Sequence, residues 1–138
     1  MSVQLNGRVA LVSGGGRGIG RGICELLASQ GASVAVNYRK DKESALETVA
    51  AIIAAGGSAR AYEASVDNPE AVAMMVDQVV ADFGYVDILV CNAGIASRGQ
   101  AVADTDPNEV LRLLNTHAIG PHHLSRCVLP SMRTRDRG

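Results

Sequence analysis

Several residue types are scarce in this chain of 138 residues, and each scarcity excludes a class of protein. There is no Trp and only one Phe, so the core has to be built from aliphatic side chains. Its 13 Lys and Arg residues nearly balance 14 Asp and Glu residues, and the resulting net charge of −1 argues against charge-driven binding of nucleic acid. We therefore expect an ordinary globular domain that binds no nucleic acid.

Cysteine and long apolar runs are also scarce. The three cysteines, Cys24, Cys91 and Cys127, lie far apart and form no Cys-x-x-Cys pair, which favours reduced, buried thiols over a disulfide framework or a zinc site. The apolar runs are far shorter than the roughly 20 residues that a membrane span needs, and Met1–Asn6 lacks the pattern of a secretory signal. We expect a cytoplasmic protein with no membrane partner.

Short β-branched runs alternate with helical patterns along the chain. Strands are predicted at 8–13, 32–37, 59–64 and 86–91, and helices before Gly31, over 41–55, over 68–83, from 106, and over about 119–132, with a basic tail at 133–138. This alternation predicts an α/β fold, a Rossmann-type doubly wound parallel sheet in three α/β/α layers, of which residues 1–138 form an NAD(P)-binding domain with four strands. The polar third strand suits a sheet edge.

Helical spacing also predicts which side chains are buried. The predicted apolar faces are Ile19, Ile23, Leu26 and Leu27; Ala45, Val49, Ile52 and Ile53; Val72, Met75, Val76, Val79, Val80 and Phe83; and Val110, Leu111, Leu113 and Leu114. Asn68 is expected to cap one helix, and Asp106 with Glu109 has the spacing of a capping box on another.

The segment Ser13-Gly14-Gly15-Gly16-Arg17-Gly18-Ile19-Gly20 joins the first predicted strand to the first predicted helix. Glycines let the backbone approach a diphosphate, and the helix behind them offers unpaired N–H groups, although a tight turn also needs glycine for structural reasons alone. A Walker phosphate loop requires Lys followed by Ser or Thr where this chain has Arg21 and Gly22. We expect a dinucleotide site formed by Gly14, Gly16, Arg17, Gly18, Ile19 and Gly20.

The end of the second predicted strand bears on which dinucleotide is bound. An acid there accepts hydrogen bonds from the adenosine 2′-hydroxyl, whereas a cation suits a 2′-phosphate. This chain has Asn37-Tyr38-Arg39-Lys40 and no carboxylate before Asp41. Together with Arg17, these residues favour NADP(H), and NAD(H) stays possible because Arg39 and Lys40 also fit an ordinary solvated strand end.

Three motifs occur in one order along the chain: Ser13-Gly14-x-x-x-Gly18-Ile19-Gly20, Asp87-Ile-Leu-Val-Cys-Asn-Ala-Gly94, and Asn115 in Leu-Leu-Asn-Thr-His-Ala-Ile-Gly120. In this order and spacing, the chain resembles the classical short-chain dehydrogenases/reductases (SDR), and most nearly their 3-oxoacyl-(acyl-carrier-protein) reductase-like members. The resemblance implies an oxidoreductase that reduces a small-molecule carbonyl, such as a ketone or a 3-oxoacyl thioester, by hydride transfer.

The same resemblance assigns roles to individual positions. Those matching the glycine turn from Ser13 and those matching Asn92, Ala93 and Gly94 hold the cofactor, those matching Ser65 and Val66 meet the adenine, and the one matching Asn115 organises a catalytic proton relay. Tyr38 and Arg39, at the end of the second predicted strand, are added to the cofactor site by their position alone. The family usually has Thr at Ser13, Asn at Cys91 and Asp-Val at Ser65-Val66. A homodimer or homotetramer is implied, with Val128, Leu129 and Met132 either in its seam or against their own sheet.

The family's catalytic residues are absent from this sequence. Family members use a Ser and a Tyr-x-x-x-Lys that follow the position of Gly138, whereas here every Tyr precedes Asn115 and no Lys follows Lys42. We expect an incompletely represented enzyme whose cofactor-binding half is inactive alone and touches substrate only through 95–99. A non-catalytic nucleotide-binding or interaction module is the alternative. The spacing of His117, His122 and His123 fits no single helix face, so no metal site is expected.

Overall fold

The β-branched runs form strands, and the segments between them form helices that end at or near glycine in several cases. The computed structural model describes residues 4–138. Its elements are β1 (Val9–Val12), α1 (Gly18–Ser29), β2 (Ser33–Tyr38), α2 (Lys42–Ala54), β3 (Ser58–Glu63), α3 (Pro69–Phe83), β4 (Ile88–Val90), the 3₁₀ turn η1 (Val102–Asp104), α4 (Pro107–Leu114), the π-helical turn η2 (Asn115–Ile119) and α5 (Gly120–Arg135). Residues 1–3 lie outside the described part of the chain. They belong to the predicted domain 1–138 and to the stretch Met1–Asn6 discussed above.

The strands form one parallel sheet in the order β3-β2-β1-β4. Val12 of β1 pairs with Val36 of β2 on one side and with Val90 of β4 on the other, so these strands end at the same edge. The predicted α/β fold and the edge position of β3 are confirmed. Within the described part of the chain, no helix is long and apolar enough to cross a membrane.

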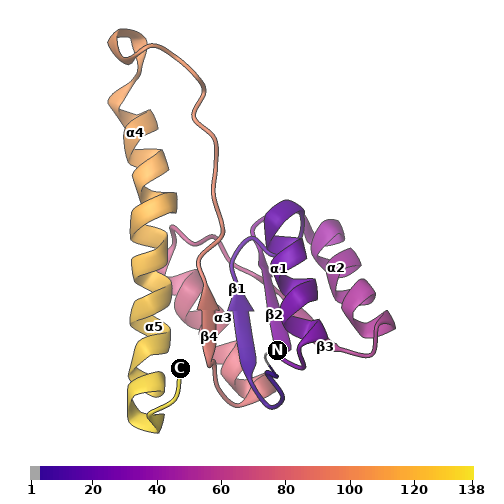
Figure 1. Ribbon diagram of the computed structural model, residues 1–138. Coiled ribbons are helices and arrows are strands. Elements are labelled where there is room, and N and C mark those ends of the chain that lie inside the picture. The colour runs from indigo at the N-terminus through magenta and orange to yellow at the C-terminus, as the bar shows by residue number, and fades with distance from the viewer. Residues whose placement is uncertain (1–3) are drawn as a thin grey trace.

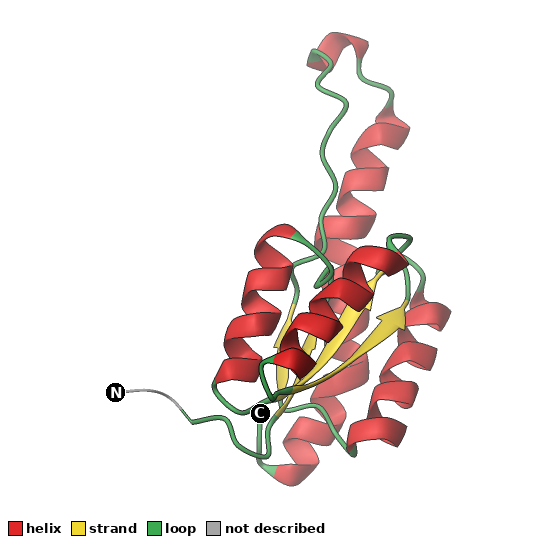
Figure 2. Ribbon diagram, turned by 90° about the vertical axis from the view of Figure 1, so that its right-hand side faces the viewer, coloured by secondary structure: helices red, strands yellow, loops and turns green. Residues whose placement is uncertain are grey.

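Helices cover both faces of the sheet (Figures 1 and 2). One core layer packs Leu11 and Ala35 against apolar residues of α3 and α5, including Val72, Val76 and Leu124. The opposite layer packs Val12, Val34 and Val36 against α1 and α2. This division of the core into two layers gives the predicted three-layer arrangement.

The predicted apolar face of α1 is only partly confirmed: Ile23 and Leu27 pack against the core, but Ile19 and Leu26 do not. Ile19 and Leu26 are 79% and 63% exposed, whereas the buried positions are the small residues Gly20, Cys24 and Ala28. Small residues at this spacing let the helix lie close to the sheet, so the larger aliphatic side chains are left on its outer side. Similar differences affect Ile53 in α2 and Val80 in α3, which are exposed. The predicted face of α4 is also wrong for Val110, Leu111 and Leu114, which are exposed. The prediction of buried thiols is right for Cys24, but Cys91 is exposed and Cys127 only half-buried; all three are free.

The last helices form one continuous rod that extends well beyond the sheet (Figure 1). The predicted tail from Arg133 is partly wrong, since α5 continues to Arg135 before Asp136 adopts a left-handed conformation. Polar contacts explain this extension: Arg135 donates to the buried carboxylate of Asp87 over 2.7 Å, and its guanidinium lies 3.9 Å from the ring centre of Tyr85. The foot of α5 is thereby anchored beside β4.

Candidate functional site

A cavity of about 480 Å³ opens at the carboxyl ends of the strands. The turn after β1, the ends of β2 and β3 and the segment after β4 all contribute to its wall, which is the usual place for a ligand in an open parallel sheet. Every predicted cofactor-binding residue except Ser13 lines it: Gly14, Gly16, Arg17, Gly18, Ile19, Gly20, Tyr38, Arg39, Ser65, Val66, Asn92, Ala93 and Gly94.

Ser13 lies just behind this wall and holds two of its segments together. Its buried Oγ accepts hydrogen bonds from the backbone N–H groups of Asn92 and Ala93, each over 3.0 Å. In return, the side-chain amide of Asn92 donates to the carbonyl oxygens of Ser13 and Gly14. These reciprocal bonds join the turn after β1 to the segment after β4, which are almost 80 residues apart in sequence.

Asn37 is a second joining residue, and its role was not predicted. This fully buried side chain at the end of β2 accepts from the N–H of Gly14 over 3.2 Å and donates to the carbonyl oxygen of Ala64 over 3.0 Å. Its amide therefore connects the segments after β1 and β3. The only signal in the sequence is a polar residue within an otherwise apolar strand.

The glycine turn is shaped as a close-fitting cradle. Gly14 has a φ of +64°, and a Cβ there would lie 2.9 Å from the Cα of Ala93; a Cβ on Gly20 would collide with the carbonyl oxygen of Gly14. Among residues 4–138, no side chain caps the N-terminus of α1, and the first turn of this helix carries no acidic residue. The free N–H groups and the positive end of the helix dipole therefore suit a bound anion such as a diphosphate.

The charged residues of the cavity lie on the turn and just after β2. Arg17, Arg39 and Lys40 contribute three cations, and Asp41 contributes one carboxylate. The Arg17 Nη1 lies 3.7 Å from Asp41 Oδ2, whereas the side chains of Arg39 and Lys40 form no hydrogen bond or ion pair within residues 4–138. These cations give the cavity wall a net positive charge.

Asn115 does not line the cavity; its neighbour Thr116 does. Asn115 is exposed at the start of η2. Instead, His117 reaches the segment after β4: its Nε2 lies 2.8 Å from the carbonyl oxygen and 3.2 Å from the N–H nitrogen of Ile95, and bonds one or the other according to its tautomer. The π-helical turn places His117 there, a feature that helical periodicity does not reveal.

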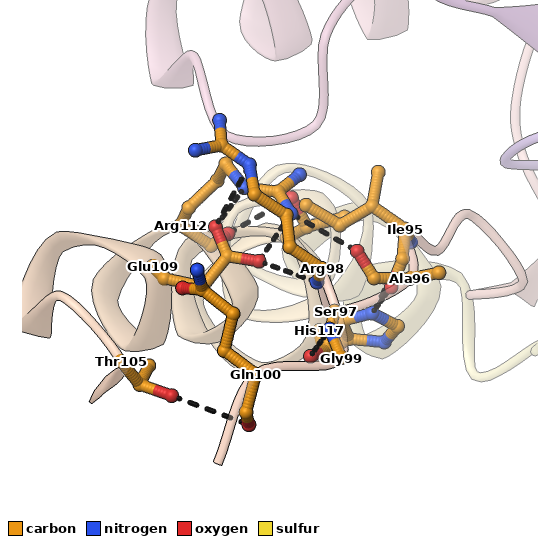
Figure 3. A network of polar contacts seen from close by, with 11 residues as sticks. Ile95, Ala96, Ser97, Arg98, Gly99, Gln100, Thr105, Glu109, Arg112 and His117 are labelled. Carbon is orange, nitrogen blue, oxygen red and sulfur yellow. Dashed lines mark hydrogen bonds and ion pairs between the residues drawn. The ribbon is translucent and has the colours of Figure 1, made fainter. Parts of the chain in front are cut away.

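A network of hydrogen bonds and ion pairs joins the loop at 96–98, which follows the segment after β4, to α4 (Figure 3). The carboxylate of Glu109 accepts from the N–H of Arg98 and from two nitrogens of Arg112, whose guanidinium also donates to the carbonyl oxygen of Ala96. The Arg112 hydrogen bonds lower the pKa of Glu109 to about 2. Asp106 caps α4 as predicted, but Glu109 serves this loop and does not close a capping box.

Known proteins share this architecture. A family model described as short chain dehydrogenase matches residues 8–138. A versicolorin reductase of Emericella nidulans is 42% identical over 123 residues, which is 89% of this chain and 46% of the relative. A tetrahydroxynaphthalene reductase of Pyricularia oryzae is 40% identical over 91% of this chain and 44% of its own length. The chain thus spans about half the length of these curated relatives.

Solved structures agree with the sequence matches. A metagenomic short-chain oxidoreductase in complex with NADP superposes with a TM-score of 0.92 and 35% identity, over 97% of this chain and 60% of the other. A short chain dehydrogenase from Burkholderia cenocepacia J2315, also in complex with NADP, gives a TM-score of 0.87 and 40% identity over 92% and 51% of the two chains. The chain therefore belongs to the short chain dehydrogenase family of oxidoreductases.

Proposed function

We propose that residues 1–138 form the cofactor-binding half of an NADP(H)-dependent reductase that acts on a small-molecule carbonyl. The observation that carries this proposal is the glycine cradle with the cations Arg17, Arg39 and Lys40 in one cavity. Two solved relatives named above were obtained in complex with NADP, which supports the same choice of cofactor.

The residues present fit this cofactor. The diphosphate would lie against Gly14, Gly18 and the N-terminus of α1. A Cβ on Gly14 would lie 2.9 Å from the Cα of Ala93, and Gly18 has a φ of +56°, which other residues rarely adopt. The 2′-phosphate would lie near Arg17 and Arg39, and the adenine near Ser65 and Val66. NAD(H) would use the same cradle but would leave the two guanidiniums without their anionic partner.

A bound nicotinamide supplies the hydride, and the residues of this chain bind and orient it. The wall at Asn92, Ala93 and Gly94 would face the nicotinamide half, held in place by Ser13 and by the contact between His117 and Ile95. Carbonyl reduction also needs a proton donor beside the substrate oxygen. Because this sequence has no Tyr after Asn115 and no Lys after Lys42, we propose that it binds cofactor but does not reduce substrate alone.

The substrate class is a ketone. A 3-oxoacyl thioester is one candidate, and the keto tautomer of a polyhydroxylated aromatic compound is a second, because one relative is named for tetrahydroxynaphthalene. We further propose a homodimer or homotetramer whose seam involves the α4–α5 rod. Of the expected seam residues, Val128 is buried in the core and Met132 packs against it, so only Leu129, which is 50% exposed, still qualifies.

The experiment is a fluorescence titration of the purified chain with NADPH and, separately, with NADH, followed by an assay for ketone-dependent NADPH oxidation. We expect saturable binding of both cofactors, tighter for NADPH, and no turnover. Absence of binding would contradict the proposal and favour a non-catalytic interaction module. Turnover by the 138-residue chain would contradict the proposal that this chain binds cofactor but does not reduce substrate alone.

A further inference from the structure

We propose that Asp41 is a specificity-determining residue that weakens the binding of a 2′-phosphate and so keeps the cavity open to NAD(H) as well as NADP(H). Of the described residues that line the cavity, Asp41 alone is acidic, and it lies beside Arg17, one of the cations available to that phosphate. This inference rests on the proposed function, since it concerns the cofactor preference of the same site.

The carboxylate of Asp41 is hydrogen-bonded at the start of α2. It caps α2, because Oδ1 accepts from the N–H of Ser44 over 3.0 Å and Oδ2 accepts from the Ser44 hydroxyl over 2.7 Å. The backbone hydrogen bond and the hydroxyl bond from Ser44 also hold the pKa of Asp41 below its usual range. An ionised carboxylate therefore remains in the cavity wall at neutral pH.

The helix that carries Asp41 is itself fastened to the glycine turn. Thr48 is fully buried, and its Oγ1 donates to the carbonyl oxygen of Gly16 over 2.9 Å. Gly16 also approaches the backbone of Ala45 so closely that a Cβ on it would lie 3.1 Å from the Ala45 nitrogen. Because α2 and the turn pack as one unit, the backbone at Asp41 keeps its place beside the glycine turn when a ligand enters, whereas the Arg17 side chain, 82% exposed, is free to turn toward the ligand.

The two cofactors respond to this carboxylate in opposite ways. A 2′-phosphate gains from Arg17, Arg39 and Lys40 but is repelled by Asp41, which also pairs with Arg17. A 2′-hydroxyl carries no charge and can donate a hydrogen bond to a carboxylate. Asp41 therefore reduces the preference for NADP(H) over NAD(H) that the three cations alone would create.

The test compares Asp41→Asn with the unchanged full chain by titrating each with NADPH and with NADH at low and at physiological salt. Asparagine caps a helix as well as aspartate does, so the variant removes the charge and keeps the cap. We expect the ratio of the NADH Kd to the NADPH Kd to rise about three- to tenfold at low salt, and less at physiological salt because screening weakens the repulsion. Glu43→Gln, in the same helical turn but outside the cavity wall, is the matched control.

The inference is overturned if the ratio of the NADH Kd to the NADPH Kd rises less than threefold in Asp41→Asn at low salt. It is also overturned if this ratio rises equally in Glu43→Gln. Asp41→Ser, which also caps without charge, provides a second variant should Asp41→Asn fold poorly, and thermal unfolding of each variant checks the helix. Failure here is distinguishable from failure of the proposed function: if Arg39→Gln weakens NADPH binding while Asp41→Asn leaves the ratio unchanged, only the role of Asp41 is wrong.

Discussion

The proposed preference for one dinucleotide depends on individual side chains of the cavity, and Arg39 is the first of them. Arg39 follows β2 directly, lines the cavity, is exposed, and has no anionic partner within the part of the chain described. A guanidinium in this state is free to form charge-assisted hydrogen bonds with a phosphate, and such bonds contribute about 1.5–3 kcal/mol each.

We predict that Arg39→Gln weakens NADPH binding about tenfold or more, because that free energy corresponds to at least one decade in Kd. NADH binding is expected to change by less than twofold, since the 2′-hydroxyl has no charge to neutralise. Parallel fluorescence titrations measure both. Arg60→Gln on β3, which removes a cation paired with Asp82 away from the cavity, is the control and should leave both affinities unchanged.

The hydrogen bond between His117 and the backbone of Ile95 is expected to support cofactor binding. His117→Gln keeps a hydrogen-bonding nitrogen and oxygen near the backbone of Ile95, whereas His117→Leu keeps the volume and removes the bond. We expect His117→Leu to weaken cofactor binding about fivefold, the effect of one lost hydrogen bond, and His117→Gln to restore most of it. Equal weakening in both variants would show that the imidazole acts by shape and not by its bond to Ile95.

Cavity residues that directly follow a strand could be predicted from the sequence. Residues whose role depends on a hydrogen-bond partner far away in the sequence could not. The glycine turn and Asn92-Ala93-Gly94 follow strands directly, so their place in the chain predicts their place in the cavity wall. Asn37 and His117 depend on partners 22 or more residues away. Neither has a signal in its own neighbourhood, because the bond exists only once the segments have packed.

At the scale of structural elements, the buried carboxylate of Glu109 holds the loop at 96–98 against helix α4. Glu109 is 7% exposed and joins α4 to Arg98 through hydrogen bonds from Arg112 and the loop backbone. Its pKa is lowered from the ordinary value of 4.5 to about 2, so the folded state favours the ionised form. The associated stability is fully present above pH 4.5 and is lost as the pH falls toward 2.

We therefore predict that Glu109→Gln lowers the free energy of unfolding at pH 7 and that the gap from the unchanged chain narrows between pH 4.5 and pH 2. Denaturant unfolding followed by circular dichroism at pH 7, 4 and 2.5 measures the gap. Glu63→Gln on β3 supplies a control carboxylate away from the loop. A gap that stays constant across this range would contradict the assigned role of the carboxylate.

Most of the elements could be predicted from the sequence because strands of Val and Ala and helices stopped by glycine differ in local pattern. Their faces were less predictable. In α1, spacing alone selected the large residues Ile19 and Leu26, but the sheet accepts the small side chains of Gly20, Cys24 and Ala28. The continuation of α5 to Arg135 was also missed, because it depends on Asp87 and Tyr85, which lie about 50 residues earlier.

At the scale of the whole molecule, the rod that projects from the sheet carries the exposed apolar residues Val110, Leu111, Leu114, Ile119 and Leu129, each between 43% and 54% exposed. Exposed apolar residues gathered on one helical segment indicate an interaction surface more often than isolated ones do. The proposed second copy of the chain would cover them, with Leu129 on α5 and Leu111 on α4 in the seam.

We predict that the unchanged chain is a dimer or tetramer in solution and that Leu111→Glu with Leu129→Glu shifts it toward monomer, because two carboxylates cannot be buried in an apolar seam without partners. Size-exclusion chromatography with light scattering over a concentration series measures the mass. Leu26→Glu, on the exposed side of α1 and 63% exposed, is the matched control and should leave the mass unchanged. If the unchanged chain is monomeric, or if all the variants share one mass, this rod is not the seam, and its apolar residues must be covered in some other way.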